Sequence, residues 1–140
     1  MQLLDGKKLS NKIELHVTEE TRKLKETCGC TPGLAVVLVG QDPASQAYVN
    51  MKKKACDRAG FYSITHDMPE TISQEAIEKT IVMLNNDTNV DGILIQLPLP
   101  AHIDTTKLLE LVAPEKDVDG FHPYNVGRLT TGLDGFVPCT

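Results

Sequence analysis

Residues 34–56 have the sequence LAVVLVGQDPASQAYVNMKKKAC and contain the two elements around which the rest of the fold can be built. The unbroken apolar run 34–39 ends at Gly40, which is typical of a parallel strand covered on both faces. Asp42 and Pro43 then favour a helix start, because proline lacks only an N–H that has no partner in the first turn. The stretch therefore predicts a strand that leads to a helix N-terminus, where open α/β sheets bind ligands.

One face of this predicted helix carries polar side chains. Ser45, Tyr48 and Lys52 are three or four residues apart and therefore share that face. Lys53 and Lys54 are rotated progressively away from it, by about 100° per residue. A lysine at the edge of an apolar surface loses part of its solvation, which favours the neutral amine and makes it a usable base. The alternative is a lysine that lays its methylenes on the core and keeps its ammonium in water.

Composition and charge exclude several classes of function. The chain has 140 residues, of which 41% are hydrophobic and 24% charged, as expected for one globular domain with a core of its own. A net charge of −5, no Trp, three Phe and three Tyr argue against a nucleic-acid partner, which needs a basic face with aromatic residues. No apolar run approaches the roughly 20 residues that cross a bilayer, and no secretory signal is visible, so we expect no membrane partner and a cytoplasmic location.

The cysteines and histidines show no spacing typical of a metal site. Cys28 and Cys30 lack a second pair at zinc spacing, and together with Cys56 and Cys139 they resemble no disulfide framework. We expect all four to be reduced thiols with structural or incidental roles. The four histidines include no i, i+4 pair, and nothing in the spacing places a histidine beside Ser45 to form a catalytic triad. No metal site is predicted.

Strands and helices alternate over most of the chain. This alternation predicts right-handed βαβ units in a three-layer α/β/α domain with a mostly parallel sheet. After Pro114 the regular pattern fails, and the remainder should be largely loop. The expected elements are a long amphipathic helix over about 5–27, a strand over 34–39, a helix over 43–59 that stops at Gly60, a more polar strand over 62–68 nearer a sheet edge, a helix over 74–84 capped by Ser73, a strand over 92–96 and a short helix over 105–112.

Gln96 is a candidate for a binding site at the end of the 92–96 strand. The following LPLP stops the strand abruptly and leaves the carboxamide at the carboxyl end of what we expect to be a central strand. The carboxamide can accept a hydrogen bond from an ammonium or donate one to a ligand carbonyl, so it can position Lys52 without adding a charge. Alternatively, Gln96 satisfies backbone groups of the loop.

Two further candidates are the acids of the tetrapeptide DVDG, Asp117 and Asp119. A carboxylate suits a ligand with adjacent N–H donors, because its two oxygens accept two parallel hydrogen bonds. Calcium would want more oxygens than this tetrapeptide provides, and turn formation at Asp-Gly is the commoner explanation.

Three stretches taken together closely resemble the methylenetetrahydrofolate dehydrogenase/methenyltetrahydrofolate cyclohydrolase family: GQDPASQAYVNMKKKAC (40–56), DGILIQLPLP (91–100) and PEKDVDGFHPYNVGRL (114–129). The resemblance covers essentially the whole chain, from the opening LLDGK to the closing PCT. It implies a catalytic N-terminal domain with a fold similar to that of amino-acid dehydrogenases. This domain shares a folate-binding cleft with a second, Rossmann-type domain that binds NADP or NAD.

The resemblance also implies roles for single residues. By motif position, Lys52 is similar to the family's essential lysine, the proton-transfer group of the cyclohydrolase step. Tyr48 resembles the tyrosine that stacks near the folate rings and helps to place that lysine, and Gln96 resembles the glutamine that holds and tunes it. Asp119 resembles the aspartate that binds the amino and ring N–H groups of the pterin. The folate-binding set implied in this way is Tyr48, Lys52, Ile95, Gln96, Leu97 and Asp119, with apolar contacts from Ile95 and Leu97.

The implied function is oxidation of 5,10-methylenetetrahydrofolate to 5,10-methenyltetrahydrofolate with NADP, followed by hydrolysis to 10-formyltetrahydrofolate. Residues 1–120 are expected to form the folate-binding catalytic domain, and residues 121–140 an irregular segment that leads toward a nucleotide-binding domain absent from this chain. The chain contains neither G-x-G-x-x-G after a strand nor a Walker A pattern, so the NADP site is expected outside it. The resemblance further suggests a homodimer for the full-length protein. The alternative is a truncated folate-binding or structural domain without turnover of its own.

Overall fold

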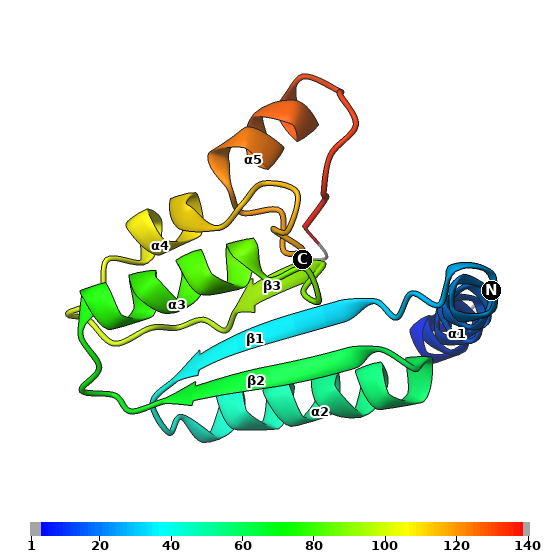
Figure 1. Ribbon diagram of the computed structural model, residues 1–140, viewed down its shortest axis with the longest axis horizontal. Coiled ribbons are helices and arrows are strands. Elements are labelled where there is room, and N and C mark those ends of the chain that lie inside the picture. The colour runs from blue at the N-terminus through cyan, green and yellow to red at the C-terminus, as the bar shows by residue number, and fades with distance from the viewer. Residues whose placement is uncertain (1–3, 139–140) are drawn as a thin grey trace.

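In the computed structural model, which describes residues 4–138, a parallel three-stranded sheet lies between helices on both of its faces (Figure 1). Helices α3 and α4 cover one face and α2 covers the other, so the predicted three-layer architecture is confirmed. No helix of the described part is long and apolar enough to cross a membrane. The elements are α1 (Gly6–Cys28), β1 (Gly33–Val39), α2 (Pro43–Ala59), β2 (Tyr62–Met68), α3 (Gln74–Asn86), β3 (Gly92–Ile95), α4 (Thr105–Leu111) and α5 (Pro123–Thr130).

The strand order is β2-β1-β3, with β1 in the centre. β1 pairs in parallel with β2 along its whole length and with β3 along all of the shorter strand. The polar strand β2 lies at an edge, as predicted. The expectation that β3 is central is wrong, because among the described strands β3 forms the other edge. Its apolar sequence is explained by helices on both faces and by an isolated parallel bridge from Ile93 to Asp117 on its outer side.

The side chains of the sheet alternate between two hydrophobic clusters, as the period of two in a strand requires. From β3, Ile93 and Ile95 enter the cluster on the α3 and α4 side, whereas Leu94 enters the cluster on the α2 side. The buried members of the α3 side are Ala35, Val37, Val39, Ile77, Ile81, Leu84, Val90, Ile93, Ile95, Ile103, Leu108 and Val112. The buried members of the α2 side are Val36, Leu38, Val49 and Leu94.

The helix that follows β1 begins and ends as its sequence predicts. Oδ2 of Asp42 accepts a hydrogen bond from the backbone N–H of Ser45 over 2.7 Å, and Pro43 occupies the first turn. This backbone bond is the main cause that lowers the pKa of Asp42. Gly60 ends α2 with a φ of 79°, in the left-handed region that favours glycine.

The chain after Pro114 is mostly loop, as predicted, but it also contains α5, which the sequence patterns did not predict. The ring Nδ1 of His122 accepts a hydrogen bond from the backbone N–H of Tyr124 over 3.0 Å, and Pro123 fills the first turn. The buried residue of α5 is polar, Asn125, while Val126 and other apolar side chains of this helix are exposed. A helix without a buried apolar stripe gives no hydrophobic period, and the proline of the first turn was the only local signal.

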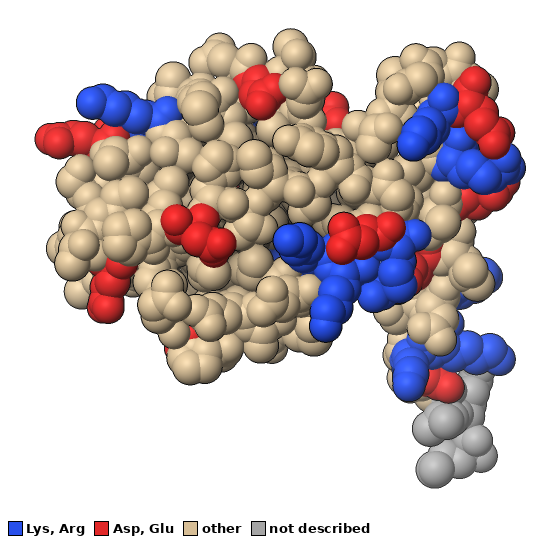
Figure 2. Space-filling view, turned by 60° about the horizontal axis from the view of Figure 1, so that its bottom comes forward, with Lys and Arg blue, Asp and Glu red and all other residues tan. Residues whose placement is uncertain are grey.

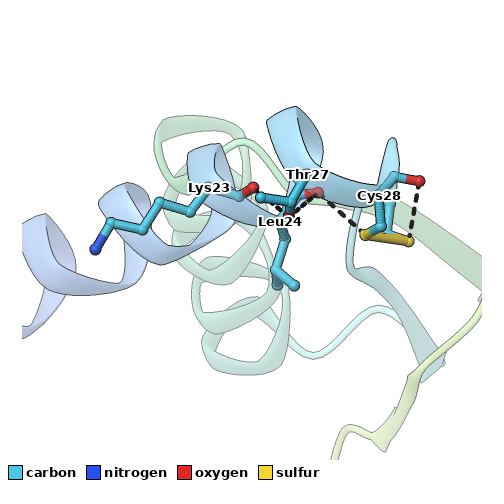
Figure 3. Close-up of a disulfide and its surroundings, with 5 residues drawn as sticks. Lys23, Leu24, Thr27 and Cys28 are labelled. Atoms are coloured by element: carbon cyan, nitrogen blue, oxygen red, sulfur yellow. Dashed lines mark hydrogen bonds between the residues drawn. A yellow bond between two sulfur atoms is a disulfide. The ribbon is translucent and has the colours of Figure 1, made fainter.

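Cys28 and Cys30 form a disulfide at the end of α1 (Figure 3), so the expectation of reduced thiols is wrong for this pair. Gly29 adopts a φ of 71° and turns the chain back, which leaves the two cysteine Cα atoms 5.3 Å apart. Only one residue separates the cysteines, so the cross-link constrains little of the unfolded chain. Cys56 is free and buried, and burial raises the pKa of its thiol. Cys139 lies outside the described residues.

Replacing Gly33 with Ala should destabilise the fold. A Cβ at Gly33 would collide with the backbone carbonyl oxygen of Asn89, which lies in the loop before β3. Because a backbone atom cannot move aside as the tip of a side chain can, we expect the free energy of unfolding to fall by about 1–3 kcal/mol. Urea denaturation measures the change. Gly6→Ala is the matched control, since a Cβ there meets nothing within 4 Å, and equal midpoints for the two variants would contradict the prediction.

Candidate functional site

The side chains of Lys52 and Gln96 meet between α2 and the end of β3. Nζ of Lys52 donates a hydrogen bond to Oε1 of Gln96 over 3.2 Å. Nε2 of Gln96 donates to the backbone carbonyl oxygen of Leu97 over 2.7 Å, which fixes the carboxamide with its oxygen toward the lysine. Both side chains are half-buried. The contact that we expected between these residues is therefore present, and it holds the amine without an opposite charge.

Only one of the three consecutive lysines of α2 turns inward. Lys52 is half-buried, whereas Lys53 and Lys54 are exposed, as the rotation of about 100° per residue predicts. Figure 2 views the molecule from the α2 side and shows basic side chains gathered near the middle of this face, beside acidic ones. Lys52 is the one that reaches the end of β3.

A charged side chain that senses the Lys52 ammonium is that of Asp119. Burial is the main cause that raises the pKa of its carboxyl; attraction by the Lys52 ammonium lowers this pKa, and repulsion by Asp117 raises it. The influence of Lys52 places the carboxylate within electrostatic range of the amine. Within residues 4–138 the two charges do not form an ion pair, so both keep hydrogen-bonding capacity for a third group.

The residue before Asp119 lies on the α2 side of the sheet. Val118 packs against the α2-side cluster and covers Gly92, where a Cβ would lie 2.5 Å from Cγ1 of Val118. Asp117 is buried, with 5% of its surface exposed. The two acids of DVDG therefore differ in their surroundings, because Asp117 is buried and Asp119 is half-buried, and the acid whose pKa Lys52 affects is Asp119.

The other predicted site residues differ in exposure and in the face of the sheet that they occupy. Tyr48 precedes Lys52 by one turn of α2 and is 56% exposed, so its ring is open to solvent, while Ser45 is buried at the start of the helix. Ile95 is 4% exposed and packs into the cluster on the α3 side, and Leu97 is half-buried against the same cluster. The structure thus joins Lys52 to Gln96 by a hydrogen bond and leaves Asp119 within electrostatic range of the amine, but it places the Ile95 side chain in the cluster on the α3 side.

A hollow of about 400 Å³ lies at the carboxyl ends of the strands, next to the end of β3. It is lined by the turn between β1 and α2 (residues 39–42), by Glu70 and by residues 98–100. The peptide bond between Leu97 and Pro98 is cis. This edge of a parallel sheet is where ligands of open α/β folds bind.

The turn between β1 and α2 does not fit the phosphates of a dinucleotide. Phosphates bind at helix N-termini where backbone N–H groups are free. Here the carboxylate of Asp42 already accepts from the N–H of Ser45 over 2.7 Å, and Pro43 has no N–H. A second anion at this position would face a negative charge. The start of α2 is therefore poorly suited to binding a phosphate.

Asn125 is a polar residue of this region for which sequence reasoning found no role. It is 2% exposed and donates hydrogen bonds to Asp117 and to the backbone carbonyl oxygen of Pro114, each over 2.9 Å. An asparagine in a stretch rich in turn residues gives no signal of burial, because such residues usually satisfy local backbone groups.

Comparison with known proteins agrees with this geometry. Residues 4–119 match the family described as tetrahydrofolate dehydrogenase/cyclohydrolase, catalytic domain. The chain is 76% identical over 140 residues to the bifunctional protein FolD of Sulfurimonas denitrificans, and the match covers all of this chain and 49% of that protein. It is 60% identical over 140 residues to the FolD protein of Helicobacter hepaticus, again covering 49% of the relative. The chain thus spans about half the length of the curated relatives it matches.

Solved structures give the same result. The bifunctional enzyme FolD-methylenetetrahydrofolate dehydrogenase/cyclohydrolase of Campylobacter jejuni superposes with a TM-score of 0.96 at 50% identity, covering 99% of this chain and 49% of that one. The N5,N10-methylenetetrahydrofolate dehydrogenase-cyclohydrolase of Trypanosoma brucei, complexed with NADP cofactor and an inhibitor, superposes with a TM-score of 0.93 at 36% identity, covering 99% and 48%.

Proposed function

This chain belongs to the family of tetrahydrofolate dehydrogenase/cyclohydrolase catalytic domains, and from that premise we propose that it supplies the folate-binding and proton-transferring half of a bifunctional enzyme. In this proposal the whole protein oxidises 5,10-methylenetetrahydrofolate to 5,10-methenyltetrahydrofolate with NADP and hydrolyses the product to 10-formyltetrahydrofolate. The observation that carries the proposal is the hydrogen bond between Lys52 and Gln96 within electrostatic range of the Asp119 carboxylate.

Binding of the folate is assigned to Asp119 and Tyr48. The two oxygens of the Asp119 carboxylate accept parallel hydrogen bonds from the amino group and the ring N–H of a pterin, and its half-buried position strengthens such bonds. The exposed ring of Tyr48, one helical turn from the amine, offers a flat face on which an aromatic part of the folate can stack. Ile95 supports the strand from the core side and is not assigned a side-chain contact with the ligand.

Proton transfer is assigned to Lys52. Hydrolysis of the methenyl group requires water to add to the bridging carbon, and a proton must then move before the ring opens. An amine near the reacting carbon performs such transfers as a general acid or base. Gln96 holds the amine by a neutral carbonyl oxygen at 3.2 Å, so no second charged side chain competes for its proton.

NADP, when bound, supplies the hydride acceptor for the oxidation. Because the turn between β1 and α2 does not fit its phosphates, we assign its binding to residues outside this chain. The contribution of this chain to the oxidation is to hold the folate. A homodimer and a cytoplasmic location, both expected from the sequence, remain predictions.

A second candidate function is folate binding without turnover. Titration of the 140-residue chain with a folate analogue, together with an assay of methenyltetrahydrofolate hydrolysis above the uncatalysed rate, separates the two candidates. Binding with hydrolysis supports the enzyme, binding without it supports the second candidate, and no binding contradicts both.

Replacing Gln96 with Ala is expected to change the pH profile of cyclohydrolase turnover. The carbonyl oxygen of Gln96 accepts a hydrogen bond from the Lys52 amine, so the substitution removes the neutral acceptor that holds this amine. The pH dependence of kcat measures the change. Gln46→Ala is the control, because the Gln46 amide donates to Gln41 and not to Lys52 or Gln96. Superimposable profiles for Gln96→Ala and the unaltered protein would count against a tuning role.

A further inference from the structure

Asp117 is a buried carboxylate held by neutral donors only. Its oxygens accept hydrogen bonds from the backbone N–H of Phe121 over 3.3 Å, from the backbone N–H of His122 over 2.8 Å and from Nδ2 of Asn125 over 2.9 Å. Only 5% of the surface of Asp117 is exposed. A charged carboxylate is unfavourable in such a buried position unless hydrogen-bond donors surround it. A turn alone could be formed by an exposed Asp or Asn, so the burial of both Asp117 and Asn125 calls for a further reason.

Asp117 joins three parts of the chain through its backbone and its side chain. On one side, the backbone at Asp117 bridges to Ile93 of β3, and the N–H of Ile93 donates to the carbonyl oxygen of Lys116 over 2.7 Å. On the other side, the Asp117 side chain reaches forward to the backbone before α5 and to Asn125 within α5. Residues 117–122 therefore form a closed loop that is attached to the strand ending beside Gln96.

Asp119 lies within this closed loop. The residues on both sides of it are anchored, Asp117 by the contacts above and Gly120 by a hydrogen bond from its N–H to the carbonyl oxygen of Asp117 over 3.2 Å. Gly120 has a φ of 67°, and a Cβ there would lie 2.9 Å from the carbonyl oxygen of Phe136. The direction in which Asp119 leaves the backbone is thus set by bonds that Asp119 itself does not make.

We propose that Asp117 and Asn125 are positioning residues, whose buried hydrogen bonds fix the loop that carries Asp119 and thereby set the affinity for the pterin part of the folate. This inference rests on the proposed folate-binding role of Asp119. It assigns to α5 a function besides packing, since α5 supplies the Asn125 amide that closes the loop from the side opposite to β3.

A purely structural role predicts a different result. If Asp117 served only to stabilise the fold, its replacement would reduce the folded fraction, and each folded molecule would bind folate as before. If Asp117 positions Asp119, the folded molecules bind folate more weakly, and the loss depends on the presence of the Asp119 carboxylate. Affinity per folded molecule and a double-mutant cycle therefore distinguish the two roles.

The test uses the whole protein with the variants Asp117→Asn, Asp119→Ala and the double variant. Asn at position 117 keeps the shape of the side chain but presents an NH₂ group to donors, so at least one of the three bonds is lost. Affinity for the stable reduced folate 5-formyltetrahydrofolate is measured by titration calorimetry, with the binding stoichiometry reporting the folded fraction. We expect Asp117→Asn to raise Kd by about 5- to 30-fold at unchanged stoichiometry, and by less than about 2-fold when Asp119 is already Ala.

Asn125→Ala is the second variant, for use if Asp117→Asn fails to fold. It removes one donor and leaves both backbone bonds, so we expect a smaller rise in Kd, about 2- to 10-fold, which again vanishes in the Asp119→Ala background. An unchanged Kd for a folded variant, or an equal rise in both backgrounds, would overturn the positioning role. An unchanged Kd for Asp119→Ala itself would instead overturn the folate-binding role on which the inference rests.

Discussion

Replacing Lys52 with Met in the whole protein is expected to abolish cyclohydrolase turnover while the fold stays intact. Met preserves most of the apolar length of the half-buried lysine and removes only the amine that donates to Gln96. Because a positioned acid or base contributes about 10²- to 10⁴-fold to a rate, we expect kcat for methenyltetrahydrofolate hydrolysis to fall by about that factor. The decay of the methenyl absorbance measures the rate, and a urea midpoint measures the fold.

Lys53→Met is the matched control for this experiment. The substitution is chemically the same, but Lys53 is exposed on the outer surface of α2 and has no described contact with Gln96. Its turnover should remain within about 2-fold of the unaltered protein, as is usual for a surface position away from the site. Turnover by Lys52→Met at the level of this control would remove Lys52 from the mechanism.

Replacing Asp119 with Ala is expected to weaken folate binding by about 1–3 kcal/mol, or about 5- to 150-fold in Kd. The variant deletes acceptors for pterin N–H groups that have lost water on binding, and an unsatisfied buried donor costs that much. Titration with 5-formyltetrahydrofolate measures the change. Asp57→Ala, which removes an exposed acid from the outer surface of α2, should leave Kd unaltered. Equal affinities for the two variants would refute the binding role.

The same carboxyl should destabilise the ligand-free fold, so Asp119→Asn is expected to raise the free energy of unfolding at pH 7. The pKa of Asp119 is raised above its ordinary value of 3.8, chiefly by burial, so the folded chain binds this proton more tightly than the unfolded chain does. Its contribution to stability is then fully present below pH 3.8 and lost as the pH rises through the raised value. Urea denaturation should show a higher free energy of unfolding for Asp119→Asn at pH 7 but not at pH 3. A lower free energy of unfolding at pH 7 would contradict the prediction.

The fold could be predicted from the sequence because local signals and burial agree over most of the chain. The apolar run of β1, the proline and aspartate at the start of α2 and the glycine at its end each favour the same boundaries that packing produces. The polar sequence of β2 correctly indicated an edge strand, since its outer face is only partly covered. The order of the strands in the sheet was harder to predict. The outer side of β3 is bonded by the backbone of residues 116–117, which follow much later in the chain.

The site was predictable only in part, for a related reason. The spacing of Tyr48 and Lys52 on one helix is a local property, and so is the position of Gln96 at a strand end. The direction of Ile95 depends on which helix covers which face, and the burial of Asn125 depends on a hydrogen bond to a residue eight positions earlier. The link between Asp119 and Lys52 likewise joins segments that only the folded chain brings together.

A crystal structure of the whole protein with bound 5-formyltetrahydrofolate tests the central claim most directly, because the claim is that one site joins Lys52, Gln96 and Asp119 around a folate. The account predicts both Asp119 oxygens at about 3 Å from the amino and ring nitrogens of the pterin. It also predicts the Lys52 amine, still held by Gln96, on the side of the one-carbon group. A folate bound against another surface, with Lys52 and Asp119 both in contact with solvent alone, would contradict it.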